Sequence, residues 1–202
     1  IDNIISPQSL SVSAKGNIYI WTENKIKIYN SHGVYQSEFG SFTNAYACVV
    51  TPKEEFVYIS DSTTHKIYKY TGAGTYVSEW GGYGTATGQF NTPCGIALDN
   101  NNDGTWNIIV CDSKNARIQF FQPDGTYVKN YIYSGMDNPT KIKSSFYQEY
   151  CIISNNNVYY GSSSEIQGLL ANITSVCGLG VGNSDYYNEY YIWIADADGL
   201  IK

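Results

Sequence analysis

The sequence predicts an all-β fold made of repeated four-stranded units, and three observations support it. The first is composition: among 202 residues there are 20 Tyr and 19 Gly, and only 15% of residues are charged. Tyr, Ile and Val favour strands, whereas Gly and Asn favour the turns between them. The second is a pattern that recurs five times, and the third is its spacing of about 40 residues. Four short strands at that period are typical of a β-propeller blade.

The repeated pattern is an apolar run that ends in a polar residue, followed by a short polar turn and a second apolar run. The polar residues that correspond are Thr22, Asp61, Asp112, Asn155 and Asp196, at spacings of 39, 51, 43 and 41 residues. A residue that recurs at this period belongs first to the scaffold. The segment 111–131 begins with Cys111 and Asp112 and holds the only arginine, yet it is predicted to be a blade segment and not an active site.

The third copy defines the strands most clearly. Apolar and aromatic runs predict strands at residues 93–99, 107–112, 116–121 and 126–131. The intervening stretches NNNDG, SKN and QPDG contain the Gly, Asn, Asp and Pro residues that turns select. First strands of the other copies begin near Leu10, Cys48, Ile142 and Leu179.

These units predict a single β-propeller domain over residues 1–202 with about five four-stranded blades. Their approximate bounds are 6–40, 44–81, 90–131, 137–170, and 175–202 together with 1–5. We expect residues 1–5 to form the outer strand of the last blade, because pairing the two ends of the chain in one blade closes the ring and hides an unpaired edge. The alternative is that the chain is part of a larger propeller.

The third copy also resembles a known family. Its stretches GQFNTPCGIALD and IIVCDSKNARIQFFQPDGTYV are similar to the NHL repeat, and SDSTTHKIYKY in the second copy is similar to the same motif, with His65 and Lys66 at the family's His-Arg position. The other three copies keep only the strand pattern and the turn glycines. The resemblance implies a β-propeller, although NHL propellers commonly carry six blades.

Charge argues against two classes of partner. The net charge is −6, and Arg117 is the only guanidinium. Nucleic-acid binding needs cations that neutralise phosphates, and anionic membranes attract the same cations, so neither partner is expected. No apolar run is long enough for a transmembrane helix. Few lysines and the sequon at Asn172 favour an extracellular or cell-surface location.

The five cysteines, Cys48, Cys94, Cys111, Cys151 and Cys177, show no zinc-ligand spacing. We expect buried thiols in strands, with a Cys94–Cys177 disulfide as the alternative. No organic cofactor is expected.

One loop resembles a calcium site. Asp99, Asn101, Asp103 and Asn107 stand at positions one, three, five and nine of the stretch DNNNDGTWN, with a glycine at position six for the turn. Calcium takes six to eight oxygen ligands, which alternate along such loops. Position twelve is valine and not the bidentate Glu of an EF-hand, so the alternative is a polar hairpin loop without an ion.

His32 and His65 are the only histidines, and both fall at turn positions of the repeat. Members of the NHL family with lyase or lactonase chemistry hold a metal and catalytic histidines around the central channel, so the resemblance implies such a site as one possibility. Two histidines at such positions do not supply a three-ligand zinc set. The chain is therefore predicted not to be an enzyme, with a metal-dependent lyase- or lactonase-like propeller as the alternative.

Aromatic residues near loops indicate a recognition surface, namely Tyr186, Tyr187, Tyr190 and Trp106. Aromatic faces beside Asn side chains suit protein or glycan contacts. We therefore expect a binding or assembly module whose partners are proteins, including copies of itself, or glycans. Burial between blades is the alternative for each of these rings.

Overall fold

The structure is a computed structural model, and it describes the chain except residues 1–3, 102, 146–148, 163–165, 173–175, 185–188, 197–198 and 202, with side chains described up to residue 162. The chain forms two compact units, Ile1–Ile96 and Ala97–Lys202, whose boundary falls within a strand. Each unit is described by itself. In the described part of the chain, no helix is long and apolar enough to cross a membrane.

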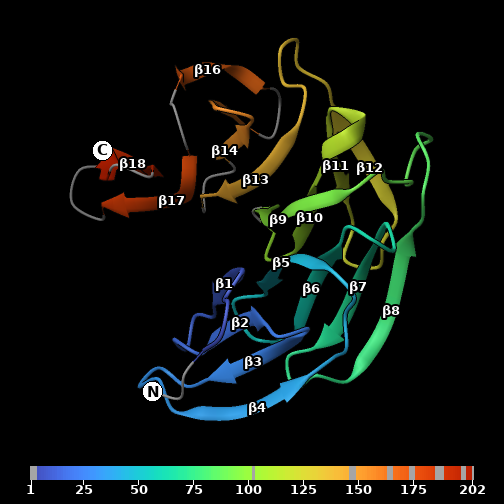
Figure 1. The fold of residues 1–202 in the computed structure, drawn as a ribbon, viewed down its shortest axis with the longest axis vertical. Helices are drawn as coiled ribbons and strands as arrows, with labels where there is room; N and C mark the ends of the chain where they lie inside the picture. Colours follow the sequence, from blue (N-terminus) through green and yellow to red (C-terminus); the bar gives the residue numbers. More distant parts are fainter. Residues whose placement is uncertain are drawn as a thin grey trace. The chain divides into compact units, whose positions relative to one another are not determined.

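The first unit holds two antiparallel sheets in which consecutive strands are neighbours (Figure 1). Blade 1 has the order β1-β2-β3-β4, with β1 at Ser9–Val12, β2 at Ile18–Thr22, β3 at Lys25–Tyr29 and β4 at Tyr35–Phe39. Blade 2 has the order β5-β6-β7-β8, with β5 at Ala45–Val50, β6 at Phe56–Asp61, β7 at Lys66–Thr71 and β8 at Tyr76–Gly81.

The second unit continues the same pattern. Blade 3 contains β9 (Pro93–Asn100), β10 (Trp106–Asp112), β11 (Arg117–Phe121) and β12 (Tyr127–Tyr131), with a 3-10 turn at Ser113–Asn115. Blade 4 contains β13 (Pro139–Ser144), β14 (Glu149–Ser154), β15 (Asn157–Ser162) and β16 (Ile166–Asn172). The last sheet contains β17 (Val176–Ser184), β18 (Glu189–Asp196) and β19 (Gly199–Ile201).

The predicted all-β class and the four-stranded antiparallel units are confirmed. In the third copy, each observed strand bound lies within one residue of its predicted bound. The blade count was wrong: four sheets have four strands, and the fifth has three in the described part of the chain.

The predicted fourth strand of the last blade, residues 1–5, lies partly outside the described residues. Ile4 and Ile5 are not in a strand. The carbonyl of Ile5 accepts a hydrogen bond from the hydroxyl of Thr22 at the end of β2, so this backbone is held beside blade 1.

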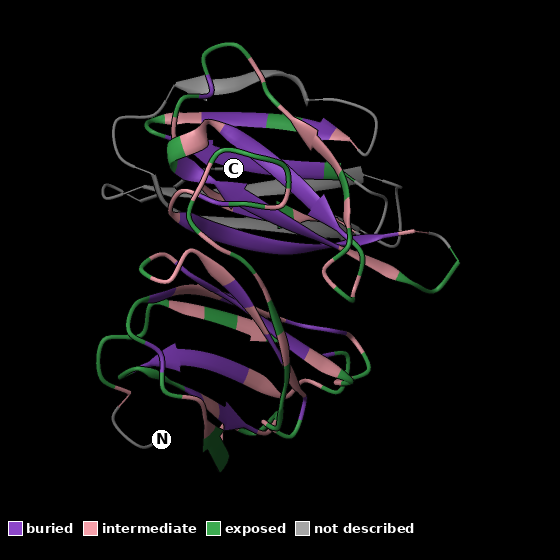
Figure 2. Ribbon diagram, turned by 90° about the vertical axis from the view of Figure 1, so that its right-hand side faces the viewer, coloured by how far each residue is buried: buried purple, intermediate pink, exposed green. Residues whose placement is uncertain are grey.

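Burial follows the strand position in the four complete blades, as far as their side chains are described (Figure 2). The second strands are almost wholly buried, as in β6 and β14, whereas the outer strands β4 and β8 are largely exposed. Side chains alternate between the two faces of a sheet, so a strand with two buried faces must be covered on both sides. Between blades 1 and 2 that cover is a core of aromatic and aliphatic side chains centred on Phe42.

A shared irregularity supports the repeat. The hairpins β3–β4, β7–β8 and β11–β12 each carry a β-bulge next to an aromatic pair. These edge-to-face pairs are Tyr29–Tyr35, Tyr70–Tyr76 and Phe121–Tyr127. Three blades thus share a structural detail that sequence spacing alone does not show.

Candidate functional site

The recurrent polar residues at the ends of the second strands serve the turns. Asp61 accepts hydrogen bonds from the backbone amides of Thr63 (2.9 Å) and Thr64 (3.0 Å). This is the local bonding for which Asp is favoured in turns. In blade 4 the strand ends at Ser154, and Asn155, the predicted equivalent, is the first turn residue with a φ of 53°.

Asp112 has the same place in blade 3 with stronger contacts. Its Oδ2 accepts from Arg117 Nε (2.7 Å), Gln119 Nε2 (3.0 Å) and Asn115 Nδ2 (2.9 Å), and the residue is fully buried. With three donors bonded to it, this carboxylate has a structural role in blade 3. The neighbouring Cys111 is also fully buried, as a thiol. The interpretation of segment 111–131 as scaffold fits these contacts.

The predicted calcium loop forms a chain of side-chain contacts. Asn107 Nδ2 donates to Asn101 Oδ1 (2.7 Å), and Asn101 Nδ2 donates to Thr105 Oγ1 (2.9 Å). Asp103 Oδ1 in turn accepts from the amide (2.8 Å) and hydroxyl (2.6 Å) of Thr105, and these bonds lower the pKa of Asp103. The structure therefore connects three of the four predicted ligands.

Asp99 occupies the buried end of this loop. Burial raises the pKa of its carboxyl group, while Tyr150, the ammonium of Lys129 and Asn107 oppose that shift. Among the described residues, Asp99 Oδ1 and Tyr150 Oη are buried without a hydrogen bond of good geometry. No three His, Cys, Asp or Glu side chains in the described part of the chain lie close enough to hold a metal ion. The calcium site stays a prediction.

Both histidines lie in turns. His65 Nδ1 accepts from the amide of Thr92 (3.0 Å), its carbonyl accepts from the amide of Gly82 (2.8 Å), and its ring packs against exposed Tyr83 at 5.0 Å. The backbone amide of His32 donates to Asn30 Oδ1 in an exposed turn. His65 thereby fixes the loop that follows blade 2.

Four thiols, those of Cys48, Cys94, Cys111 and Cys151, are buried in strands, as expected from their spacing. The alternative Cys94–Cys177 disulfide involves Cys177, whose side chain lies outside the described residues. Burial raises the pKa of the Cys151 thiol to about 12, which keeps it protonated and unreactive.

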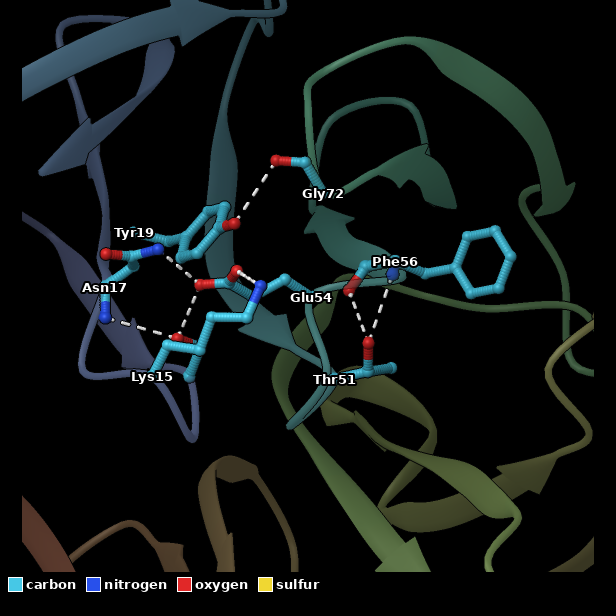
Figure 3. A network of polar contacts seen from close by, with 8 residues as sticks. Lys15, Asn17, Tyr19, Thr51, Glu54, Phe56 and Gly72 are labelled. Atoms are coloured by element: carbon cyan, nitrogen blue, oxygen red, sulfur yellow. Dashed lines mark hydrogen bonds and ion pairs between the residues drawn. The ribbon is translucent and has the colours of Figure 1, made fainter. Parts of the chain in front are cut away.

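A polar network that sequence reasoning missed joins two loops of the first unit (Figure 3). Glu54 Oε1 accepts from Ser13 Oγ and Asn17 Nδ2, each at 2.6 Å, and Oε2 pairs with Lys15 at 2.9 Å. Burial favours a raised pKa for Glu54, but the bonds from Ser13, Lys15 and Asn17 outweigh it and lower the pKa.

Tyr19 lies beside this network and is bonded to the same unit (Figure 3). Its hydroxyl donates to the carbonyl of Gly72 (3.2 Å), and burial, followed by the charge of Glu54, raises its pKa to about 12. The only signal in the sequence was the polar run SAKGN facing TPKEE. The three partners of the Glu54 carboxylate lie between β1 and β2 of blade 1, and Glu54 lies between β5 and β6 of blade 2. The network therefore links the two blades, and we call it the clamp.

The predicted aromatic contact residues are only partly placed. Tyr186 and Tyr187 lie outside the described residues, and Tyr190 pairs with Asn183 between β18 and β17. Trp106 begins β10 and is half-buried. The structure does not bring these four into one described surface.

Exposed apolar residues recur instead at the start of the outer strands. Val34 and Tyr35 are 55% and 41% exposed, and Tyr76 and Val77 are 51% and 43% exposed. Val128 in β12 is 41% exposed. The repeated stretch GVY, GTYV, GTYV was the available signal.

Solved structures with the same fold are found, although no protein-family model and no curated protein matches the chain. A streptogramin B lyase is 18% identical in sequence, with a TM-score of 0.68. The match covers 100% of this chain and 70% of the lyase chain. Virginiamycin B lyase from Staphylococcus aureus is 17% identical, with a TM-score of 0.68, and the match covers 99% of this chain and 70% of the lyase chain. Hydrazine synthase of Kuenenia stuttgartiensis is 15% identical, with a TM-score of 0.69, and the match covers 96% of this chain and 57% of the synthase chain.

These comparisons define the class of protein: the chain has an all-β propeller fold with four-stranded antiparallel blades. At such identities the similarity shows the fold alone. The chain spans 70% of each lyase and 57% of the hydrazine synthase chain.

Proposed function

We propose that this chain is a single domain of NHL-type repeats that acts as a non-catalytic binding or assembly module outside the cell. Its partners are proteins, including copies of itself, with glycans as a second class of ligand. The observation that carries the proposal is that exposed aliphatic and aromatic side chains lie at or directly before the start of β4, β8 and β12: Val34, Tyr35, Tyr76, Val77 and Val128. Exposed apolar side chains on the outer strand of a blade provide contact area for a partner.

The polar groups support the same proposal. Asp61, Asp112 and His65 hold turns, so these carboxylate and imidazole groups already have structural partners. Chemistry at such a group would require those bonds to break first.

Sedimentation velocity over a hundredfold range of concentration tests the proposal. We expect the native protein to self-associate as its concentration rises, and the variant Val34→Lys/Val77→Lys/Val128→Lys to remain monomeric, because three charges would have to be desolvated in the contact. A native protein that stays monomeric throughout and binds no glycan on an array would contradict the proposal.

A control variant places the same added charge elsewhere. Ser41→Lys/Ala73→Lys/Thr85→Lys changes three exposed loop positions. Its association should match that of the native protein. If both variants are monomeric, net charge controls association, and the side chains of Val34, Val77 and Val128 do not.

Calcium binding is part of the proposal and has a matched pair of variants. Asp103 and Asp124 both accept a hydrogen bond from the amide of the threonine two residues later, at 2.8 and 2.9 Å. We expect calcium to raise the melting temperature over that in chelator, Asp103→Asn to remove most of the increase, and Asp124→Asn to keep it. No increase in the native protein means that the loop is a hairpin without an ion.

The fold similarity to streptogramin B and virginiamycin B lyases favours a second candidate, a lyase- or lactonase-like enzyme with a metal in the central channel. Incubation with virginiamycin B and divalent metals, followed by mass spectrometry, tests it. Turnover that chelator abolishes would replace the binding module by this enzyme.

A further inference from the structure

Lys129 of blade 3 places its ammonium group over two aromatic rings. The nitrogen lies 4.7 Å from the ring centroid of Phe120 and 5.1 Å from that of Tyr131. A cation within about 6 Å of a ring centroid is attracted by the negative face of the ring. The register explains this contact, because Phe120 on β11 pairs with Lys129 on β12 and the two side chains share one face of the sheet.

A third ring comes from the next blade. Tyr150 of β14 meets Phe120 edge to face, with 5.8 Å between the ring centroids and 64° between the ring planes. Phe120 and Tyr131 form a similar pair at 5.1 Å and 76°. Phe120 and Tyr150 are buried, whereas Tyr131 and Lys129 on the outer strand are half-buried. The rings of Phe120, Tyr131 and Tyr150 form a cage for the nitrogen, which we call the ammonium cage.

An acidic group stands beside the ammonium cage. Asp99 is 2% exposed, and burial raises the pKa of its carboxyl group, while Tyr150 and the charge of Lys129 oppose that rise. In the part of the chain whose side chains are described, Asp99 Oδ1 is one of three buried polar atoms without a hydrogen bond, and Tyr150 Oη is another. Native proteins rarely leave such atoms without a partner, so this oxygen is available to stabilise a further positive group.

These groups suit a substituted ammonium ion better than a lysine. Aromatic cages are the usual recognition element for quaternary ammonium groups. The ammonium of lysine is compact and strongly hydrated, so its removal from water is costly. Methyl groups on the nitrogen weaken that hydration and add apolar contact with the rings, while the positive charge stays. A quaternary ammonium ion therefore enters the same cage at a lower desolvation cost.

Lys129 can leave the cage without a change in the backbone. β12 is the outer strand of blade 3, and the neighbouring Val128 is 41% exposed, so a side chain that turns outward on this strand reaches water. The lysine stem has four carbons and is flexible. All the contacts described above lie within the second unit, Ala97–Lys202.

We propose that the ammonium cage, together with Asp99, is a binding site for small quaternary ammonium ions such as choline, and that Lys129 is its internal competitor. The ligand displaces the lysine nitrogen from the rings and brings its own charge beside Asp99. A tethered competitor lowers the apparent affinity of the native protein, and its removal reveals the full affinity. The inference adds a ligand class and does not depend on the proposed protein or glycan partners.

Calorimetric titration of Lys129→Ala with choline tests the proposal. Chelator is present throughout, because Asp99 is also a predicted calcium ligand. The control ligand is 3,3-dimethyl-1-butanol, which has the shape of choline without the charge. We expect Lys129→Ala to bind choline at least about tenfold more tightly than the native protein, since the internal competitor is gone. The alcohol should bind more weakly than choline, and Lys129→Ala/Asp99→Asn should bind choline more weakly than Lys129→Ala. Equal binding of choline and the alcohol, or no binding of choline by folded Lys129→Ala, would overturn the proposal.

The native protein gives an independent readout that needs no folded variant. Acetylation of each lysine by acetic anhydride is followed by peptide mass spectrometry in tetramethylammonium chloride or in sodium chloride of equal concentration. Tetramethylammonium should raise the acetylation rate of Lys129 at least about threefold, because a displaced amine is open to the reagent. The rate at the exposed Lys114 should stay the same. An unchanged rate at Lys129 would contradict the displacement, and an equal rise at both lysines would overturn it as a general salt effect.

Discussion

Replacing Glu54 tests how much one carboxylate contributes to holding blades 1 and 2 together. Glu54→Ala removes the acceptor of Ser13 and Asn17 and the partner of Lys15. Each bond from a neutral donor to the carboxylate contributes about 1 kcal/mol, and the ion pair to a mostly exposed Lys15 adds at most about 1 kcal/mol. Glu54 has a φ of 61°, which an alanine there would share, so backbone strain cancels. We expect the free energy of unfolding to fall by about 2–3 kcal/mol.

The pH dependence gives the prediction a second test. The pKa of Glu54 is lowered from 4.5 in the folded protein, so its ionised form stabilises the fold fully above that pH. The contribution is lost as pH falls through the folded pKa. The difference in unfolding free energy between the native protein and Glu54→Gln should therefore be largest at neutral pH and shrink below about pH 4.

Urea unfolding followed by tryptophan fluorescence measures both effects, since Trp21 is buried in the same unit. Glu55→Gln is the control, because Glu55 is the exposed neighbour and should change stability by less than about 0.5 kcal/mol. A loss below that value for Glu54→Ala, or a Glu54→Gln difference that stays constant from pH 7 to 3, would refute the clamp.

Three other substitutions test the fold. Asp112→Ala leaves the guanidinium of Arg117 buried without its carboxylate, and calorimetry should show that the free energy of unfolding falls by about 3–5 kcal/mol. A fall as small as that for an exposed ion pair would mean that water reaches this pair. Phe42→Ala opens a cavity between blades 1 and 2 and should cost about 3–5 kcal/mol in urea unfolding, against little change if the blades are loosely packed. Gly72→Ala would place a methyl group 1.9 Å from the carbonyl of Glu54; we expect a lower melting temperature, and an unchanged one would contradict this close approach.

Local pattern was enough to predict the blades. The runs around Ile108 and Phe120 alternate with turn residues, and this periodicity depends only on the sequence near each strand. The hairpin turns held by Asp61 and Asp112 were predictable for the same reason, because Asp bonds amides two or three residues away.

Contacts between blades were not predictable in this way. Glu54 reaches Ser13 across 41 residues, and no feature of either segment alone specifies that bond. The hydroxyl of Thr22 likewise bonds the carbonyl of Ile5 over 17 residues, a contact that the spacing of the repeat does not indicate.

The bulges at Tyr29, Tyr70 and Phe121 affect the outer edge of each of these three blades. A bulge bends its strand and increases the local twist, so the outer edges of three blades are poor templates for the straight, repetitive strand addition that builds amyloid. Each of these blades can thus keep aliphatic and aromatic groups in water along its outer edge without offering a straight backbone for strand pairing.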